Sequence, residues 1–366
     1  MFNGKRLSLA RKRQKLTAKE LAEKAGVSPV TITRLETGQN QADSGTLEKL
    51  AEVLGYPVQF FFKEDPALLS AEIVSFRSLS SMTAKERNAA LSAGDNGVEV
   101  YEWLENRYNL PALDLPHFDP ELTPEAAADA LRQHWGLSYQ PIANMMKLME
   151  AKGIRVLGLE ETTANVDAFS FWQNDKAYVF LNSFKSAERS IFDAAHELGH
   201  LVLHRHGQTS GADEDTRTAE VEANRFASAF LMPEEDVRVR MPRLITADLI
   251  LRAKKRWRVS AMALAYRLAH LTRPMLSEWQ YRSICIELGK RGYRTSEPDG
   301  IPRETSVLWG KVLSQLWAER KSLVDVADEL SLPMTEVERL LFCILPQHGT
   351  DNEGSEVRRS KLSIVK

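Results

Sequence analysis

The first sixty residues place apolar side chains at helical spacing in four short segments. Thr17 and Ser28 stand before the second and third segments as N-caps, and Gly26 lies in the turn between them, where it can adopt a positive φ. The spacing predicts helices over residues 7–13, 18–24 and 28–35, and from Ser44 or Thr46 to Leu54. The core that they share is expected to comprise Leu21, Ala22, Val27, Ile32 and Leu35. The pattern therefore predicts an all-α helix-turn-helix domain over residues 1–62.

The next segment, residues 63–122, has a weaker pattern and is expected to be a partly helical connector. Helices are indicated over 83–92 and 98–108. The stretch that follows is interrupted by prolines at positions 111, 116 and 120.

From residue 123 to residue 272 the apolar positions change between helical and alternating spacing. Alternation predicts strands over 153–157, 169–172 and 177–182, the last two joined by a turn at Asn174 and Asp175. Helical spacing predicts helices over 123–134, 141–151, 186–204, 216–231, 247–256 and 261–271. This central domain is therefore expected to be α+β with a small sheet.

Helical spacing returns after residue 273 and predicts a helical C-terminal domain over 273–348. Within it, residues 322–342 have the rhythm of a helix-turn-helix. The polar tail 349–366 is expected to be disordered. The fold class expected for the whole chain is multidomain and mainly α.

Charge is unevenly distributed along the chain although the net charge is only −2. The first nineteen residues hold seven lysines and arginines and no acidic residue, whereas residues 213–222 are rich in Asp and Glu. This asymmetry indicates an end that faces nucleic acid and a separate acidic site. The two cysteines, Cys285 and Cys343, exclude a disulfide framework and a thiolate zinc cluster. With no signal peptide and no apolar run long enough to cross a bilayer, a cytoplasmic protein without membrane contact is expected.

The most informative motif is His196-Glu197-Leu198-Gly199-His200, which reads H-E-x-x-H. On a helix the two histidines lie one turn apart on one face and can bind one Zn²⁺. Glu197 is then placed to act as the general base in metal-assisted amide hydrolysis. Gly199 permits close packing of a neighbouring helix. The pattern predicts a zinc site with Glu197 as the catalytic residue.

A catalytic zinc site needs a third protein ligand, and three residues compete for that role. Glu220 and Asn224 share one face of the next predicted helix, while Glu222 points roughly 200° away from Glu220. We therefore expect Glu220 to bind the metal and Asn224 to hydrogen-bond a ligating histidine, with Glu222 as the alternative. His204 continues the face of His200, but three ligands along one straight helix would strain a tetrahedral site. His204 is accordingly expected to pack beside the ligands or hydrogen-bond to one of them.

The developing oxyanion of such a hydrolysis needs a second stabilising group besides the metal. Tyr178, Arg189 and His206 are the candidates, although cross-strand packing is the more common role for a residue such as Tyr178 and a surface ion pair for one such as Arg189. The strand 178–181 before the motif is a candidate for binding an extended substrate by edge addition.

In a helix-turn-helix, the second helix enters the major groove of double-stranded DNA and its first residues contact the base edges. Here that helix begins at Ser28, so the expected base contacts are Ser28, Val30, Thr31 and Arg34. The basic cluster between residues 11 and 15 is expected to contact backbone phosphates through Arg11 and Arg13.

These motifs resemble two known families. Residues 5–56, with Leu21-Ala22, Ala25-Gly26-Val27-Ser28 and Arg34-Leu35-Glu36-Thr37-Gly38, resemble the Xre or lambda-repressor type of DNA-binding domain. Ala18 stands where that family often has Gln, and Ala42 where many members have Pro, so the operator cannot be read from this chain. Xre-type domains usually bind as dimers, which implies a homodimer.

Residues from about 125 to 272 resemble the ImmA/IrrE zinc metallopeptidases, which are zincin-like and of gluzincin type. The matching pieces are Phe180-Leu181-Asn182, Glu188-Arg189, the H-E-x-x-H stretch with His204, Glu220-Val221-Glu222-Ala223-Asn224-Arg225-Phe226-Ala227 and Leu231-Met232-Pro233. The resemblance implies that His196, His200 and Glu220 bind Zn²⁺ and that Glu197 is the base. Asp193 stands where an apolar or hydroxyl residue is usual.

The two resemblances together imply a DNA-binding transcriptional regulator that also carries out regulated proteolysis. Its zinc endopeptidase would cleave a partner protein, a repressor or an antitoxin-like protein, in a stress, phage or mobile-element response. The alternative is a transcription regulator whose zinc domain is a non-catalytic sensor or interaction scaffold. The intact set of His196, Glu197, His200 and Glu220 favours the first interpretation.

Overall fold

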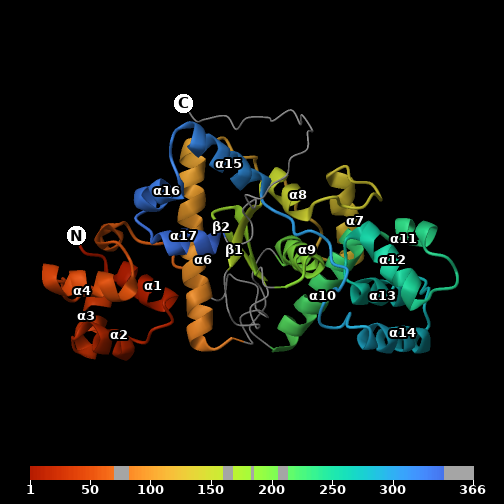
Figure 1. Cartoon of the computed structure of the whole chain (residues 1–366), viewed down its shortest axis with the longest axis horizontal. Helices are drawn as coiled ribbons and strands as arrows, with labels where there is room; N and C mark the ends of the chain where they lie inside the picture. Colours follow the sequence, from red (N-terminus) through yellow and green to blue (C-terminus); the bar gives the residue numbers. More distant parts are fainter. Residues whose placement is uncertain (70–81, 160–167, 183–184, 205–212, 342–366) are drawn as a thin grey trace. The chain divides into compact units, whose positions relative to one another are not determined.

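The computed structural model of the chain describes residues 1–69, 82–159, 168–182, 185–204 and 213–341. The chain is mainly α-helical with one small sheet, and it divides into two compact units (Figure 1). Unit 1 consists of Met1–Pro111, Leu157–Val166 and Val307–Lys366, and unit 2 of Ala112–Val156 and Asp167–Ser306. The expectation of a multidomain, mainly α chain is therefore confirmed.

The N-terminal part of unit 1 is a bundle of short helices with capped ends. It comprises α1 (Gly4–Arg13), α2 (Ala18–Ala25), α3 (Pro29–Glu36), α4 (Ser44–Leu54) and the 3-10 helix η1 (Val58–Phe62). Thr17 and Glu20 form a capping box at the start of α2, and Ser28 caps α3. Gly26 ends α2 with a φ of 66°, a left-handed conformation that glycine adopts without a steric penalty. The predicted helix-turn-helix over α2 and α3 is confirmed.

The expected break in the connector is absent, because α6 (Ala84–Arg107) runs as one helix through Gly94, Asp95, Asn96 and Gly97. These residues weaken an exposed helix, but here all four are buried, and α6 packs against α1. Tertiary burial has overridden the local propensity.

Unit 1 is completed by three helices from the far end of the chain. They are α15 (Val307–Ala318), α16 (Leu323–Leu330) and α17 (Met334–Leu340), and α16 packs against α6. The segment 273–348, expected as one C-terminal domain, is thus shared between the two units.

The sheet has three described strands in the order β1-β3-β2, with β1 at Arg155–Leu159, β2 at Ala168–Gln173 and β3 at Lys176–Asn182. The antiparallel pair β2–β3 places Phe169 opposite Phe180 and turns at Asn174 and Asp175, whose φ values of 49° and 57° suit a tight hairpin. The predicted strand pair is confirmed. The expected edge addition at strand 178–181 is wrong, however, because β3 is the central strand and β2 lies at the edge among the described strands.

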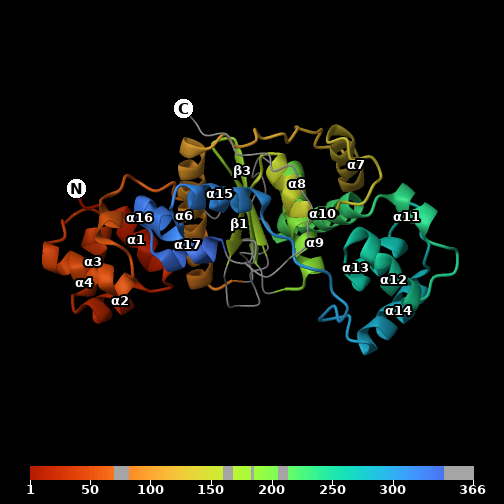
Figure 2. The ribbon, with the colours of Figure 1, turned by 45° about the horizontal axis from the view of Figure 1, so that its top comes forward.

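The helices of unit 2 surround the sheet's β2–β3 face and the motif helix. α9 (Ala187–Leu203) packs against β2 and β3, and α10 (Asp213–Leu231) packs against both α9 and α7 (Figures 1 and 2). Helix α9 is capped by Ser186. The remaining helices are α7 (Pro124–His134), α8 (Met145–Ala151), α11 (Glu234–Arg240), α12 (Ala247–Trp257), α13 (Ala261–Ala269) and α14 (Glu278–Lys290).

Some of the sequence-based expectations fall on residues that the structure does not describe. His206 and the tail 349–366 lie outside the described residues. Among the helices that are described, none combines the length and the apolarity needed to cross a membrane.

Candidate metal centre

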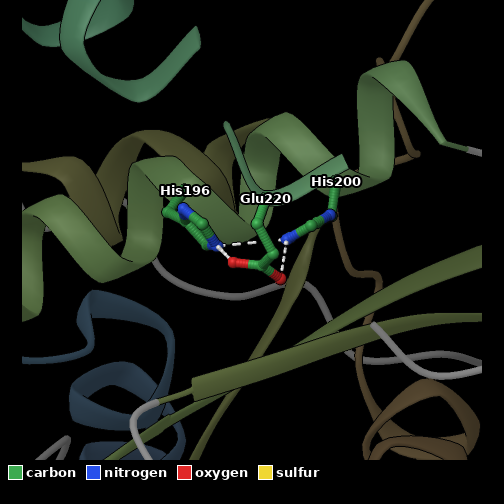
Figure 3. Close-up of side chains that lie close together, drawn as sticks. All are labelled: His196, His200 and Glu220. Carbon is green, nitrogen blue, oxygen red and sulfur yellow. Dashed lines mark hydrogen bonds and ion pairs between the residues drawn. The ribbon is translucent and has the colours of Figure 1, made fainter. Parts of the chain in front are cut away.

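Two helices bring three side chains together in unit 2. His196 and His200 project from α9, one turn apart, and Glu220 projects from α10 between them (Figure 3). The Nε2 atoms of the histidines lie 3.0 Å from each other, and each lies 3.3 Å from one oxygen of the Glu220 carboxylate. All three side chains are largely buried. Among the described residues, this group of His, His and Glu has the arrangement of a metal-binding site.

The spacing of these donor atoms fits a zinc ion. Ligand atoms at the usual Zn–N and Zn–O distances of a tetrahedral site lie about 3.3 Å apart. The separations of 3.0 and 3.3 Å match that value. Two imidazoles and one carboxylate are also a donor set that catalytic zinc sites use, with the fourth position left open.

The outer nitrogens of the histidines have partners that orient the rings. His196 Nδ1 lies 3.1 Å from Asn224 Oδ1, which can only accept, so the ring donates from Nδ1 and keeps the lone pair of Nε2 toward the site. His200 Nδ1 lies 3.1 Å from His204 Nδ1, and His204 Nε2 lies 2.9 Å from Glu222 Oε2. Since the Glu222 carboxylate accepts from His204 Nε2, a neutral His204 accepts at Nδ1 from His200. With the proton on Nδ1, each imidazole has an Nε2 lone pair available to a metal ion beside Glu220; with a proton on Nε2, that N–H donates to the Glu220 carboxylate.

The two residues that competed with Glu220 as ligands are thus placed behind His200. His204 follows the last turn of α9 and contacts His200 from the side away from Glu220. Glu222 holds His204 rather than facing the metal-binding group. This chain of hydrogen bonds is consistent with the helical phase that favours Glu220 over Glu222.

Burial and mutual attraction shift the ionisation of the three side chains. Burial raises the pKa of Glu220, but its hydrogen bonds to His196 and His200 outweigh that effect and hold the pKa well below its usual range. Burial lowers the pKa of His200 to about 4, against the opposing effect of Glu220. Burial opposes the charged form of His196, but its hydrogen bond to Glu220 and the nearby carboxylates outweigh burial and raise its pKa. Glu220 and His200 are thus held in the ionisation states that a divalent cation requires of its ligands.

Glu197 lies on the same helix and is almost fully buried, with 3% of the residue exposed. Burial raises the pKa of its carboxyl to about 7, although His196 and a hydrogen bond from Ser170 oppose the rise. Ser170 Oγ donates to Glu197 Oε2 over 2.6 Å and projects from β2. Sequence reasoning missed Ser170, although a hydroxyl between Phe169 and Phe171 in an apolar strand was the signal available. A carboxyl whose pKa lies near neutral pH is suited to accept a proton and to donate it again.

Gly199 lets α9 and α10 approach closely enough to form this site. A Cβ at this position would lie 3.1 Å from a ring carbon of Phe226 and 3.3 Å from the Cα and carbonyl oxygen of Ala223. Both neighbours belong to α10, next to Glu220 and Asn224. The absence of a side chain therefore sets the distance over which Glu220 reaches the histidines.

The three candidates for oxyanion stabilisation are not brought to the metal-binding group by the described structure. Tyr178 is buried and stacks on Phe171 at 5.0 Å, with Arg155 over its ring. Arg189 is exposed in the first turn of α9, seven residues before His196. His206 lies outside the described residues.

The residues expected to contact bases lie on one exposed helix of unit 1. Ser28, Val30 and Arg34 are exposed at or within α3, and Thr31 is half-buried. Val30 is 57% exposed, so its side chain is accessible from solvent.

The two arginines expected to contact phosphate have protein partners. Arg11 makes a bidentate pair with Glu36 and donates to the carbonyl of Leu16. Arg13 is buried, and its Nε–H is shared between the two carboxylate oxygens of Glu336. Both guanidinium groups thus have carboxylate partners within unit 1, and their contact with phosphate stays a prediction. The sequence could not reveal the partner of Arg13, because Glu336 is 323 positions away.

Comparison with known proteins agrees with both halves of this description. Residues 7–61 match a helix-turn-helix family model, and residues 149–269 match the model of the IrrE N-terminal-like domain, peptidase family M78. Among curated proteins, none matches the chain. One similar solved structure is a transcriptional regulator from Mycobacterium tuberculosis, with 19% identity over 41% of this chain and 47% of that one and a TM-score of 0.31. The chain therefore joins an N-terminal helix-turn-helix domain of the Xre type to an ImmA/IrrE-like domain of peptidase family M78.

Proposed function

We propose that this chain is a DNA-binding transcriptional regulator whose ImmA/IrrE-like domain is a zinc endopeptidase that cleaves a partner protein. The observation that carries the proposal is the convergence of His196, His200 and Glu220, with the buried Glu197 beside them. A site used only for scaffolding would not need Glu197 to stay ionisable in an apolar setting. The partner is a transcription factor or an antitoxin-like protein, because the peptidase is joined to a DNA-binding domain.

His196, His200 and Glu220 are the residues that would hold the zinc ion. Bound there, the ion supplies Lewis-acid chemistry to an amide substrate. The role of Asn224, His204 and Glu222 is to keep the two imidazoles oriented for that purpose.

Glu197 is the residue that would accept a proton from the attacking water and return it to the leaving amine. The hydrogen bond from Ser170 to Oε2 fixes the orientation of the carboxyl. Ser170 lies on β2, the edge strand of the described sheet, which packs against α9. An extended substrate that paired with this edge would pass close to Glu197.

The test compares three purified proteins loaded with zinc: the wild type, Glu197→Gln and the control Glu235→Gln, whose side chain is exposed on α11. Each is incubated with the products of neighbouring genes, and the mixtures are searched for cleavage fragments. The wild type and Glu235→Gln are expected to cut one candidate, and Glu197→Gln to lose at least 100-fold of that activity. If all three bind zinc and leave every candidate intact, the domain is a non-catalytic sensor or scaffold.

The DNA-binding half of the proposal places α3 in the major groove of an operator, with the chain acting as a homodimer. Arg34→Ala is expected to weaken binding to operator DNA by about tenfold or more, since an arginine contact to a base contributes about 1–3 kcal/mol. The control Arg282→Ala removes an exposed arginine of unit 2 and should leave binding unchanged. Equal affinity of the wild type and Arg34→Ala in a gel-shift assay would refute the placement of α3.

A further inference from the structure

The local structure of residues 17–36 recurs at residues 322–341, so that each residue corresponds to the one numbered 305 higher. Helix α2 begins with a capping box of Thr17 and Glu20, and α16 begins with one of Ser322 and Asp325. Both helices have eight residues and end in a left-handed residue, Gly26 with a φ of 66° and Ser331 with a φ of 53°.

The turn that follows each helix is also the same. The N–H of Val27 donates to the carbonyl of Ala22 over 3.0 Å, and the N–H of Leu332 donates to that of Ala327 over 2.9 Å. The next helices begin at equivalent positions, α3 at Pro29 and α17 at Met334. The two segments therefore share the length and capping box of the first helix, the turn geometry and the turn hydrogen bond. The second helices differ, because α17 has seven residues against eight in α3 and lacks a side-chain cap like that of Ser28.

The buried positions of the two segments correspond as well. Each member of the following pairs is no more than 5% exposed: Leu21 and Val326, Ala22 and Ala327, Ala25 and Leu330, Ile32 and Val337, Leu35 and Leu340. Arg34 has its counterpart in Arg339. Because the fold and the core both correspond, residues 322–341 have the architecture of a helix-turn-helix motif.

The surface chemistry of this second motif is unsuited to DNA. Residues 17–36 balance three acidic against three basic residues, whereas residues 322–341 hold five acidic residues and one arginine. Thr31, one of the expected base contacts, is replaced by Glu336. Apart from the buried Glu336, four acidic residues remain against one arginine, and such a surface would be repelled by the phosphate backbone.

The acidic groups of the second motif instead contact basic groups of unit 1. Glu336 accepts from Arg13 Nε over 2.7 and 2.9 Å and from Asn96 Nδ2 over 2.9 Å, in a setting where Arg13 and Glu336 are 3% and 2% exposed. Glu329 accepts from Trp103 over 2.8 Å and pairs with Arg107.

A third cation meets the end of α16, where Lys63 Nζ donates to the carbonyl of Leu330 over 2.8 Å. Both views show α16 and α17 beside α6 in unit 1 (Figures 1 and 2). The charges of the motif and of the surface that it contacts are therefore complementary.

We propose that residues 322–341 are a second helix-turn-helix motif that binds the chain's own DNA-binding domain rather than DNA. Its second helix, α17, directs Glu336 at Arg13 of α1, where the corresponding position of α3 holds the half-buried Thr31. The partner of this surface is the basic end of α1 together with the neighbouring face of α6. The motif thereby retains Arg13 within unit 1 and keeps it from the phosphate backbone.

The first experiment measures thermal unfolding of the full chain. Glu336→Gln leaves the buried charge of Arg13 without its counter-ion and is expected to lower the unfolding midpoint by about 3 °C or more. The matched control Glu338→Gln changes an exposed glutamate two residues away and should shift the midpoint by less than about 1 °C.

The double variant Arg13→Gln/Glu336→Gln removes both charges and is expected to unfold at a higher temperature than Glu336→Gln, which keeps the experiment informative if the single variant fails to fold. Equal midpoints for Glu336→Gln and Glu338→Gln would overturn the docking role. So would a double variant that unfolds at a lower temperature than Glu336→Gln.

The second experiment separates docking from DNA reading. Arg339→Ala is expected to leave the affinity for DNA and its salt dependence within about twofold of the wild type, whereas Arg34→Ala weakens binding about tenfold or more. If Arg339→Ala weakens binding as much as Arg34→Ala, the second motif reads DNA and the proposal is refuted. If neither change has an effect, the proposed role of α3 fails, while the unfolding experiment still decides the docking.

Discussion

Replacing Gly199 by alanine tests whether the approach of α9 to α10 sets the geometry of the metal centre. The added Cβ would lie 3.1 Å from Phe226 and 3.3 Å from the backbone of Ala223. The Phe226 ring can move, but the carbonyl of Ala223 is held in α10, so the helices must separate by a few tenths of an ångström. Glu220, one turn before Asn224 on α10, would move away from the histidines with it.

Two opposing free-energy terms decide the effect on stability. Alanine stabilises a helix relative to glycine by about 1 kcal/mol, whereas overpacking a close contact costs about 1–3 kcal/mol. Gly289 on α14 offers a matched control, because a Cβ there meets nothing within 4 Å. We therefore expect Gly289→Ala to stabilise the chain by about 1 kcal/mol, and Gly199→Ala to be less stable than Gly289→Ala by about 1–3 kcal/mol.

Zinc affinity gives the second readout for the same pair of variants. A shift of one ligand at a site of this kind is expected to weaken binding by about 10–100-fold, which competition with a chelator measures. Gly289→Ala should bind zinc as the wild type does. If urea unfolding shows equal stabilisation by both substitutions and the chelator finds equal affinities, the contact between α9 and α10 does not control the site.

Three other predictions follow from single side chains. His204→Ala removes the acceptor for His200 Nδ1 and should weaken zinc binding by about 10–100-fold; unchanged affinity would show that the hydrogen-bond chain from Glu222 has no role. Burial raises the pKa of Asp95 to about 7, so this carboxyl takes up a proton on folding, and the stability of the wild type relative to Asp95→Asn should fall between pH 4 and 7 and then level off. A difference in urea unfolding that does not vary with pH would contradict this sign. Arg132→Met leaves the carbonyls of Ser138, Phe230 and Gln140 without their shared buried donor and should cost about 3 kcal/mol or more, whereas a loss below 1 kcal/mol would mean that water replaces the guanidinium.

Local patterns were sufficient to predict the parts of the site that lie on two helices. The spacing of His196 and His200 is a property of α9 alone, and the orientation of Glu220 relative to Glu222 is a property of α10 alone. Each follows from the periodicity of its own helix. Ser170 could not be predicted in the same way, because its contact with Glu197 depends on how β2 packs under α9. The order of the strands, which places β2 at the edge, likewise depends on pairing between distant segments.

The helix-turn-helix fold of residues 17–36 was predictable because its caps and its turn glycine are local signals. The continuity of α6 was not predictable from the sequence, because glycines such as Gly94 and Gly97 weaken a helix when they are exposed. Here both glycines are buried, and α6 packs against α1. The pairing of Arg13 with Glu336 could not be predicted from the sequence either. Basic residues at the start of a DNA-binding domain predict phosphate contacts, and nothing near them in the sequence indicates Glu336.

The pairing of Arg13 with Glu336 also has a consequence during synthesis of the chain. A ribosome that adds about 5–20 residues per second needs roughly 16–65 s to make the 323 residues that separate the two partners. Throughout that interval the nascent N-terminal helices exist without a complete α17, and the Arg13 guanidinium has not yet met its carboxylate. Until residue 336 leaves the ribosome, the newly made DNA-binding domain therefore carries one more accessible positive charge than the finished protein does.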